Sequence, residues 1–126
     1  MSQGSQITHY YLMSMKDSCD RILKYAEGVT YEKFATDFML IDAIERNFLV
    51  LGEASKKVPY RFKKKFDRIP WESMYRLRNR IAHEFFDVDP EMLWAIIQND
   101  LQDNLNDLVQ IIHQNQTVSN IRRKKF

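Results

Sequence analysis

The amino-acid sequence predicts an all-α fold, a four-helix up-and-down bundle with a short additional helix near residues 31–36 or 60–67. Apolar residues recur at steps of three or four along four long segments, which is the period of an amphipathic helix. Several glycine and proline residues lie at the borders of these segments, where helices begin and end. With 126 residues, a hydrophobic fraction of 44% and a charged fraction of 29%, the chain matches one soluble globular domain.

The first helix is predicted over residues 8–27, and Gly28 is well placed to end it. The single cysteine, Cys19, lies on the apolar stripe of this helix, so we interpret it as a small core residue. One cysteine cannot form a disulfide within the chain. The stripe consists of Leu12, Met15, Cys19, Ile22, Leu23 and Ala26.

The second helix is predicted over residues 38–57, with Thr30 or Thr36 as the capping residue before it and Pro59 after it. Gly52 lies inside this helix, where glycine costs about 1 kcal/mol relative to alanine. A glycine at that cost indicates that another helix approaches closely there. The apolar stripe consists of Phe38, Ile41, Ile44, Phe48, Leu51 and Ala54.

The third helix is predicted to begin at Pro70 and the fourth at the Asp89-Pro90 pair, because proline suits the first position of a helix. The fourth helix runs to the end of a helical domain of residues 1–115, and the basic tail of residues 116–126 is expected to be flexible. The third stripe consists of Trp71, Met74, Leu77, Ile81 and Phe85. The fourth consists of Leu93, Ile97, Leu101, Leu105, Leu108 and Ile112.

Three polar residues of the third helix, Arg78, Asn79 and His83, form the candidate catalytic group. A guanidinium can grip a phosphate with two hydrogen bonds, and an imidazole with an ordinary pKa of about 6.5 can take or return a proton. Arg78 would hold the phosphate and its developing charge, while His83 would act as general acid or base. Asn79 is four residues before His83, hence on the same face, and would orient His83 or a phosphate oxygen.

Arg78 and His83 are poorly placed to meet within one helix. They are five residues apart, which places them about 140° apart around the helix and about 7.5 Å apart along it. A second copy of the helix, related by a two-fold axis, would bring two Arg and two His into one groove, so we expect a homodimer. The spacing alone leaves an alternative, in which Arg78 is a solvated cation and His83 is bonded to a backbone carbonyl.

Two charged stretches of opposite sign flank the candidate group. Residues 56–68 hold seven Lys and Arg against one acid, with three aromatic residues interleaved, a pattern typical of surfaces that bind phosphates and bases. A solvated connection between helices is the other interpretation. Residues 84–107 hold seven acids and no Lys or Arg, so this part should repel RNA and attract a basic partner. The residues expected to contact substrate are Lys63, Lys64, Lys65 and Arg80.

The composition also sets what the chain is not expected to contain. No apolar run reaches the roughly 18 residues that a membrane span needs, and the N-terminus lacks a basic and apolar leader, so we expect a cytoplasmic protein. Three scattered histidines and one cysteine give no metal-ligand spacing, and no glycine-rich phosphate loop is present. We therefore expect neither a metal nor another cofactor.

Several motifs, in order along the chain, resemble those of the HEPN superfamily and, within it, the HepT group of bacterial toxins. They are D-A-I-E-R-N-F-L-V-L-G-E-A-S-K-K-V-P at 42–59, I-P-W at 69–71 and R-N-R-I-A-H-E-F-F-D-V-D at 78–89. The resemblance covers residues 8–112, nearly the whole chain. It implies an all-helical homodimer whose R-N-x-x-x-H motif, here Arg78, Asn79 and His83, cleaves RNA at a composite site, with tRNA as the favoured substrate class.

The resemblance further implies an antitoxin partner, a small nucleotidyltransferase of the MNT type. Many members of the HepT group continue the motif as H-x-Y, and the antitoxin is understood to modify that tyrosine with AMP. Here the position is Phe85, which has no hydroxyl to accept AMP. Two modes of restraint remain: modification of another hydroxyl, of which Tyr75 is the nearest aromatic one, or inhibition by binding, with the acidic fourth helix as a candidate docking face. Inhibition by binding is the expected mode.

The sequence thus predicts a metal-independent endoribonuclease toxin. One alternative is a noncatalytic helical module that docks on a nucleotidyltransferase or presents RNA to it, since Arg and His serve binding equally well. Another is a structural homodimer with no nucleic-acid contact.

Overall fold

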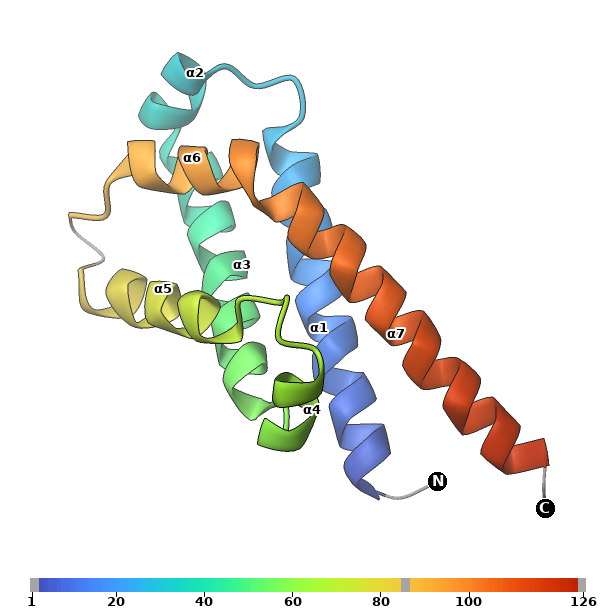
Figure 1. Cartoon of the computed structure of the whole chain (residues 1–126). Coiled ribbons are helices and arrows are strands. Elements are labelled where there is room, and N and C mark those ends of the chain that lie inside the picture. Colours follow the sequence, from blue (N-terminus) through green and yellow to red (C-terminus); the bar gives the residue numbers. More distant parts are fainter. Residues whose placement is uncertain (1–2, 85–86, 125–126) are drawn as a thin grey trace.

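The structure, a computed structural model, describes residues 3–84 and 87–124, with side chains described for residues 4–84 and 87–115. These residues form seven helices and contain no strand, which confirms the all-α prediction (Figure 1). The helices are α1 (Gln3–Ala26), α2 (Tyr31–Thr36), α3 (Phe38–Lys57), α4 (Tyr60–Lys65), α5 (Trp71–His83), α6 (Pro90–Asn99) and α7 (Leu101–Lys124).

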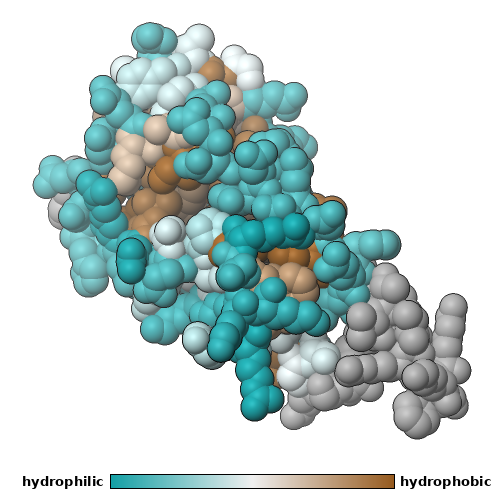
Figure 2. All heavy atoms as spheres, in the orientation of Figure 1, coloured by the Kyte–Doolittle hydropathy of each residue, from teal (hydrophilic) through white to brown (hydrophobic). Residues whose placement is uncertain are grey.

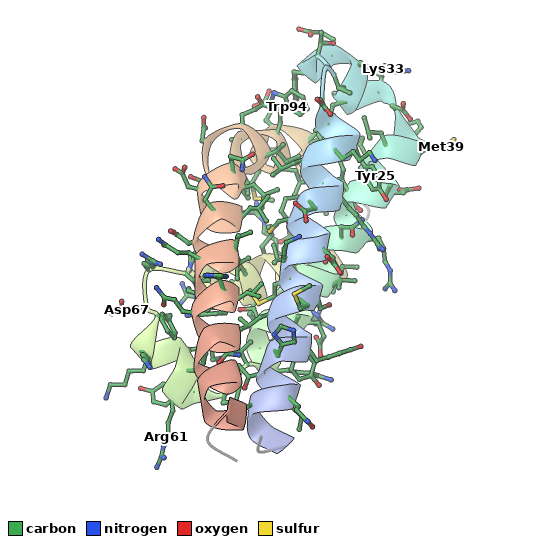
Figure 3. All side chains as sticks on the ribbon, turned by 90° about the vertical axis from the view of Figure 1, so that its right-hand side faces the viewer. Tyr25, Lys33, Met39, Arg61, Asp67 and Trp94 are labelled. Carbon is green, nitrogen blue, oxygen red and sulfur yellow. The ribbon has the colours of Figure 1, made fainter. Side chains whose placement is uncertain are left out.

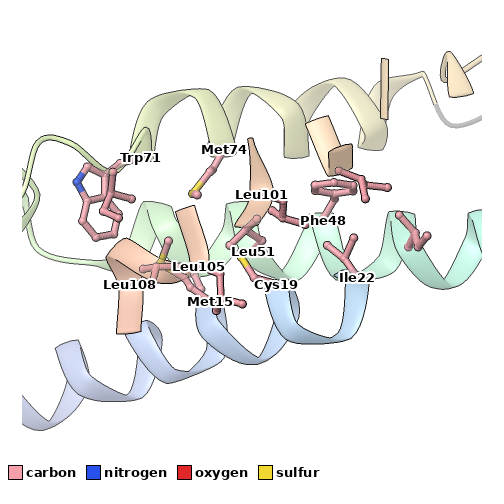
Figure 4. Close-up of a cluster of buried hydrophobic side chains, with 14 of the residues drawn as sticks. Met15, Cys19, Ile22, Phe48, Leu51, Trp71, Met74, Leu101, Leu105 and Leu108 are labelled. Atoms are coloured by element: carbon pink, nitrogen blue, oxygen red, sulfur yellow. The ribbon is translucent and has the colours of Figure 1, made fainter. Parts of the chain in front are cut away.

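Helix α3 is the centre of the bundle. It lies between α1 and α5, and α7 packs beside α1, as Figures 3 and 4 show. The apolar stripes predicted for these helices supply most of the core, and α2 and α6 add Phe34, Leu93 and Ile97 to the same cluster (Figure 4). Phe38 of the predicted second stripe is not part of it, since it is 77% exposed. The labelled members of the cluster are Met15, Cys19, Ile22, Phe48, Leu51, Trp71, Met74, Leu101, Leu105 and Leu108.

The connection between α1 and α3 follows the expected signals in part. Gly28 adopts a φ of 71°, the left-handed conformation that ends a helix, as predicted. Thr30 caps the short helix α2 by accepting a hydrogen bond from the Lys33 N–H at 3.2 Å. Thr36 is not a cap, since Asp37 accepts the hydrogen bond from the Leu40 N–H at 3.1 Å at the start of α3. Asp37 is the residue directly before α3, whereas Thr36 is the last residue of α2.

Both candidate short helices exist, as α2 and α4. The borders of two longer helices differ from those expected. Helix α1 begins at Gln3 rather than at residue 8. Pro70 lies just before α5 rather than at its first position, with φ −81° and ψ 64°.

The prediction of a single fourth helix after Pro90 is wrong, because α6 and α7 are separate helices that meet at Asp100. Helix α6 crosses the end of the bundle against α2 and α1, whereas α7 descends along α1 (Figure 1). One straight helix could not cover both surfaces. The apolar stripe continues across the bend, since Ile97 and Leu101 are four residues apart and both buried. Helix α7 then continues to Lys124, past the expected domain border at residue 115.

Candidate functional site

Helix α5 carries the candidate catalytic group and is fixed to α3 at its first turn. The Ser55 hydroxyl on α3 is fully buried and donates a hydrogen bond to the Trp71 carbonyl at 2.8 Å. The Trp71 indole N–H donates to the Phe66 carbonyl at 3.0 Å. Because buried polar groups are costly to leave unpaired, these bonds specify where α5 starts.

A close approach of the two helices occurs at Gly52, as its position in the sequence indicates. A Cβ atom on Gly52 would overlap the Cβ of Arg78 and lie 2.6 Å from the Met74 carbonyl oxygen. Only a residue without a side chain allows the backbones to come so near. The Arg78 side chain therefore projects from α5 at this close approach to α3.

The Arg78 side chain is held by two partners. Its Nε atom lies 3.3 Å from a carboxylate oxygen of Glu53 on α3, and one terminal N–H group donates to the Asn79 amide oxygen at 2.9 Å. The side chain remains 33% exposed. A guanidinium has five N–H donors, so three stay available beside these two contacts with described residues. Arg78 is thus oriented and still able to bind an anion.

Arg78 lines a cleft of about 360 Å³ between α1, α3 and α5. Its polar and aromatic wall residues come from all three helices: Tyr10, Tyr11, Ser14, Arg46, Glu53, Lys57 and Arg78. Three cations face one carboxylate there, so the cleft favours an anionic ligand. Arg46 and Glu53, seven residues apart on one face of α3, lie within the motif at residues 42–59, but their spacing gave no reason to assign them a role.

His83 lies outside the cleft that Arg78 lines. It is the last residue of α5, is exposed, and is not among the residues that line the cleft, whereas its neighbour Ala82 is. No hydrogen bond between described residues joins His83 to Arg78 or to Asn79. The Asn79 amide oxygen instead accepts a hydrogen bond from Arg78. Within one chain, α5 therefore presents Arg78 toward the cleft and His83 toward solvent.

The other predicted substrate-binding residues lie outside the cleft. Arg80 points toward α6, with its Nε 3.2 Å from Glu84 and a terminal nitrogen 3.0 Å from the Met92 sulfur. Lys63 donates to the Lys56 carbonyl at 3.5 Å. Lys64 and Lys65 are exposed on α4. The structure does not bring these four cations together with Arg78.

A second hollow, of about 290 Å³, lies between α5, α6 and the start of α7. Figure 2 shows apolar side chains in this region, between α5 and α6. Its floor and walls are mainly apolar, including Phe48, Leu51, Met74, Leu77, Ile96 and Leu101. Among its lining residues, Asp100 is the one ionisable group, so it offers no cationic site for a phosphate.

None of the helices is both long and apolar enough to cross a membrane in the part of the chain that the structure describes. Within the same part, no group of three or more His, Cys, Asp and Glu side chains is placed to hold a metal ion.

An all-helical bundle with the R-N-x-x-x-H motif on one of its packed helices is the arrangement of the HEPN class of proteins. The family described as "Ribonuclease HepT-like" matches residues 15–113, most of the chain. The chain belongs to the HepT-like ribonuclease family. The resemblance carried by the sequence motifs is confirmed.

Three relatives illustrate this kinship. "Putative RNase MJ0127" of Methanocaldococcus jannaschii is 32% identical over 101 residues, covering 80% of this chain and 80% of its own. "Probable ribonuclease HepT" of Thermococcus cleftensis is 32% identical over 91 residues, covering 72% and 83%. "Putative RNase TTE0752" of Caldanaerobacter subterraneus is 26% identical over 104 residues, covering 82% and 93%. No solved structure matches the chain.

Proposed function

We propose that the chain is a metal-independent endoribonuclease that uses Arg78 and His83. The observation that carries the proposal is the environment of Arg78, which Glu53 and Asn79 hold at the wall of an open cationic cleft. A guanidinium that is oriented before substrate arrives stabilises charge on a phosphate without reorganising during the reaction. The names of the relatives, which refer to ribonucleases, support the same class of reaction.

The proposed reaction needs one base and one acid. The ribose 2′-hydroxyl loses its proton to an imidazole and attacks phosphorus, the P–O5′ bond breaks, and the 5′-oxygen leaves with a proton from an acid. The products are a 2′,3′-cyclic phosphate and a free 5′-hydroxyl. Arg78 would bind the nonbridging oxygens as charge develops on them. Asn79 would serve as a positioning residue, through its hydrogen bond to Arg78.

A homodimer would supply both proton-transfer groups. Arg78 faces the cleft and His83 faces solvent on the same helix, so a second copy packed against that exposed end would complete the site. Two copies of His83 could then act as base and acid. Mixing Arg78→Ala with His83→Ala protein should restore part of the activity that each lacks; no recovery despite demonstrated subunit exchange would contradict a site shared in this way.

We also propose that the protein is the toxin of a toxin-antitoxin pair, with tRNA as its favoured substrate class and an MNT-type nucleotidyltransferase as its antitoxin. Phe85, at the position where the resemblance places an AMP-accepting tyrosine, lies outside the described residues. Since phenylalanine has no hydroxyl, we propose restraint by binding. Intact mass after incubation with the antitoxin, ATP and magnesium tests this; an added AMP whose inhibition survives removal of the antitoxin would contradict it.

The primary test is cleavage of cellular RNA by the purified protein in excess EDTA. Replacing His83 by Ala should lower the rate by about 10² to 10⁴. Arg78→Lys should also lose most activity, because a point charge cannot reproduce the two-pronged grip of a guanidinium. RNA binding without any cleavage would favour a noncatalytic module, and full activity of His83→Ala would remove His83 from the mechanism.

A further inference from the structure

We infer that the Arg78 cleft holds one unpaired nucleotide of the RNA substrate, with its base stacked on Tyr10 and its phosphate bound by Arg46. Both residues line the cleft together with Arg78, although they come from α1 and α3. The inference rests on the proposed function and adds to it a substrate class, single-stranded RNA, and two residues outside the R-N-x-x-x-H motif.

Tyr10 has the properties of a stacking platform. Its side chain is 68% exposed at the cleft, whereas the neighbouring Tyr11 is half-buried and packs against the core. The two rings lie edge to face, with centroids 5.3 Å apart and planes at 78°. Tyr10 thus keeps one edge contact with Tyr11 while most of its surface stays exposed for stacking. Every nucleobase has an apolar face that can stack on such a ring.

Arg46 is the cation with most freedom in the cleft. It is exposed and forms no ion pair or hydrogen bond with any residue that the structure describes, in contrast to Arg78, which is paired with Glu53. Lys57, on the same helix, has its ammonium 6.0 Å from the Tyr11 ring centroid. The aromatic pair thus shares the cleft with more cations than carboxylates. A nucleotide supplies the matching features, an aromatic base joined to a phosphate.

The size of the cleft suits one unpaired nucleotide. A volume of about 360 Å³ lies near the lower end of the roughly 300–1,000 Å³ typical of small-ligand pockets. Bases inside a duplex are stacked on both faces and cannot reach a side chain in a cleft, whereas bases in loops can turn outward. The substrate region next to the cut is therefore single-stranded.

Binding of a fluorescent single-stranded RNA, followed by anisotropy with the slowly cleaving His83→Ala protein, tests the inference. Adding Tyr10→Ala should weaken binding by roughly 5- to 150-fold, the loss of one base–aromatic stack. Tyr10→Phe keeps the ring and should restore most of the affinity. Tyr25→Ala is the matched control, because Tyr25 is another partly exposed tyrosine of α1 but lies at its far end, toward α2 (Figure 3).

Two further measurements separate stacking from charge. Arg46→Ala should reduce the dependence of log affinity on log salt by about 0.7, the effect of one lost phosphate contact on a single strand, while Tyr10→Ala leaves that slope unchanged. Scanning the RNA with abasic nucleotides should find one position at which the Tyr10→Ala protein and its Tyr10 parent bind equally. A uniform difference at all positions would overturn the assignment of one base to Tyr10.

The outcomes distinguish this inference from the proposed function. If the wild-type protein does not cleave RNA yet Tyr10→Ala weakens single-strand binding, the catalytic proposal fails and the binding site stands. If cleavage is normal but Tyr10→Ala binds and cleaves like the wild type, the inference fails alone. A change of Tyr10→Ala from dimer to monomer by light scattering would also overturn it, since the ring would then be a contact between protomers.

Discussion

Replacing Gly52 by Ala should damage both stability and activity, because Gly52 lies where α3 and α5 meet. The new methyl group would stand 2.6 Å from the Met74 carbonyl oxygen, where an ordinary contact needs about 3.4 Å, and it would overlap the Arg78 Cβ, so α5 must move by at least about 0.8 Å. Such overpacking costs about 1–3 kcal/mol, partly offset by the roughly 1 kcal/mol that alanine gains inside a helix. We expect a net loss of up to about 2 kcal/mol, or up to about 8 °C in Tm.

The same shift would displace Arg78, whose Cβ the new methyl group would overlap. A misplacement of about 1 Å in a catalytic group can lower the rate by about 10²-fold, so cleavage should fall far more than the folded fraction does. Urea unfolding and initial rates of RNA cleavage in EDTA measure the two effects.

Gly28→Ala is the control for this experiment. Gly28 has a φ of 71° with nothing near its missing side chain, so alanine there is strained by about 1–2 kcal/mol without touching the site. Its stability should fall by a similar amount while the folded protein keeps full activity. Unchanged stability and activity in Gly52→Ala, or an equal loss of activity in both variants, would refute the reasoning.

Three other predictions concern single side chains. Glu53→Gln should lower kcat by up to about 10²-fold with little change in KM, because Glu53 positions the Arg78 guanidinium rather than binding RNA, and a proportionate rise in KM would contradict this. Burial raises the pKa of the Cys19 thiol to about 12, so a thiol reagent should modify it only after unfolding; rapid labelling of native protein would be the opposite result. The pKa of Asp37 lies below its ordinary 3.8, mainly because it accepts a backbone hydrogen bond. Its ionised form thus stabilises the fold above the unfolded-state pKa, and this contribution disappears as pH falls through the lower folded-state pKa. Asp37→Asn cannot titrate and should flatten the loss of stability in urea unfolding between neutral pH and about pH 3.

The long helices were predictable from sequence because they bury continuous apolar stripes. Periodicity identifies the buried face of a helix, and glycine or capping residues identify its ends, as Gly28 shows. Periodicity cannot show a bend that keeps the stripe in phase. The step from Ile97 to Leu101 matches an uninterrupted helix, so the break at Asp100 followed only from how α6 and α7 pack on other elements.

The candidate site was predictable only in part, for a related reason. Arg78 and His83 carry recognisable chemistry within one helix, whereas the cleft that receives Arg78 is built from three helices. Helical spacing places Arg46 on an outer face of α3 but does not say which helix stands opposite that face. Tyr10, near the beginning of α1, could not be predicted as a site residue, because the role of an exposed tyrosine depends on which residues lie next to it in space.

Gly52 and Glu53 link the fold to the chemistry. A glycine inside a helix weakens that helix by about 1 kcal/mol, and this cost persists only where the close approach is itself useful. Because α5 rests on Gly52, the Arg78 guanidinium comes within 3.3 Å of the carboxylate that follows Gly52 in the chain. A larger residue at position 52 would separate the two helices and this ion pair together. The packing that stabilises the bundle is therefore also the packing that orients Arg78 in the cleft.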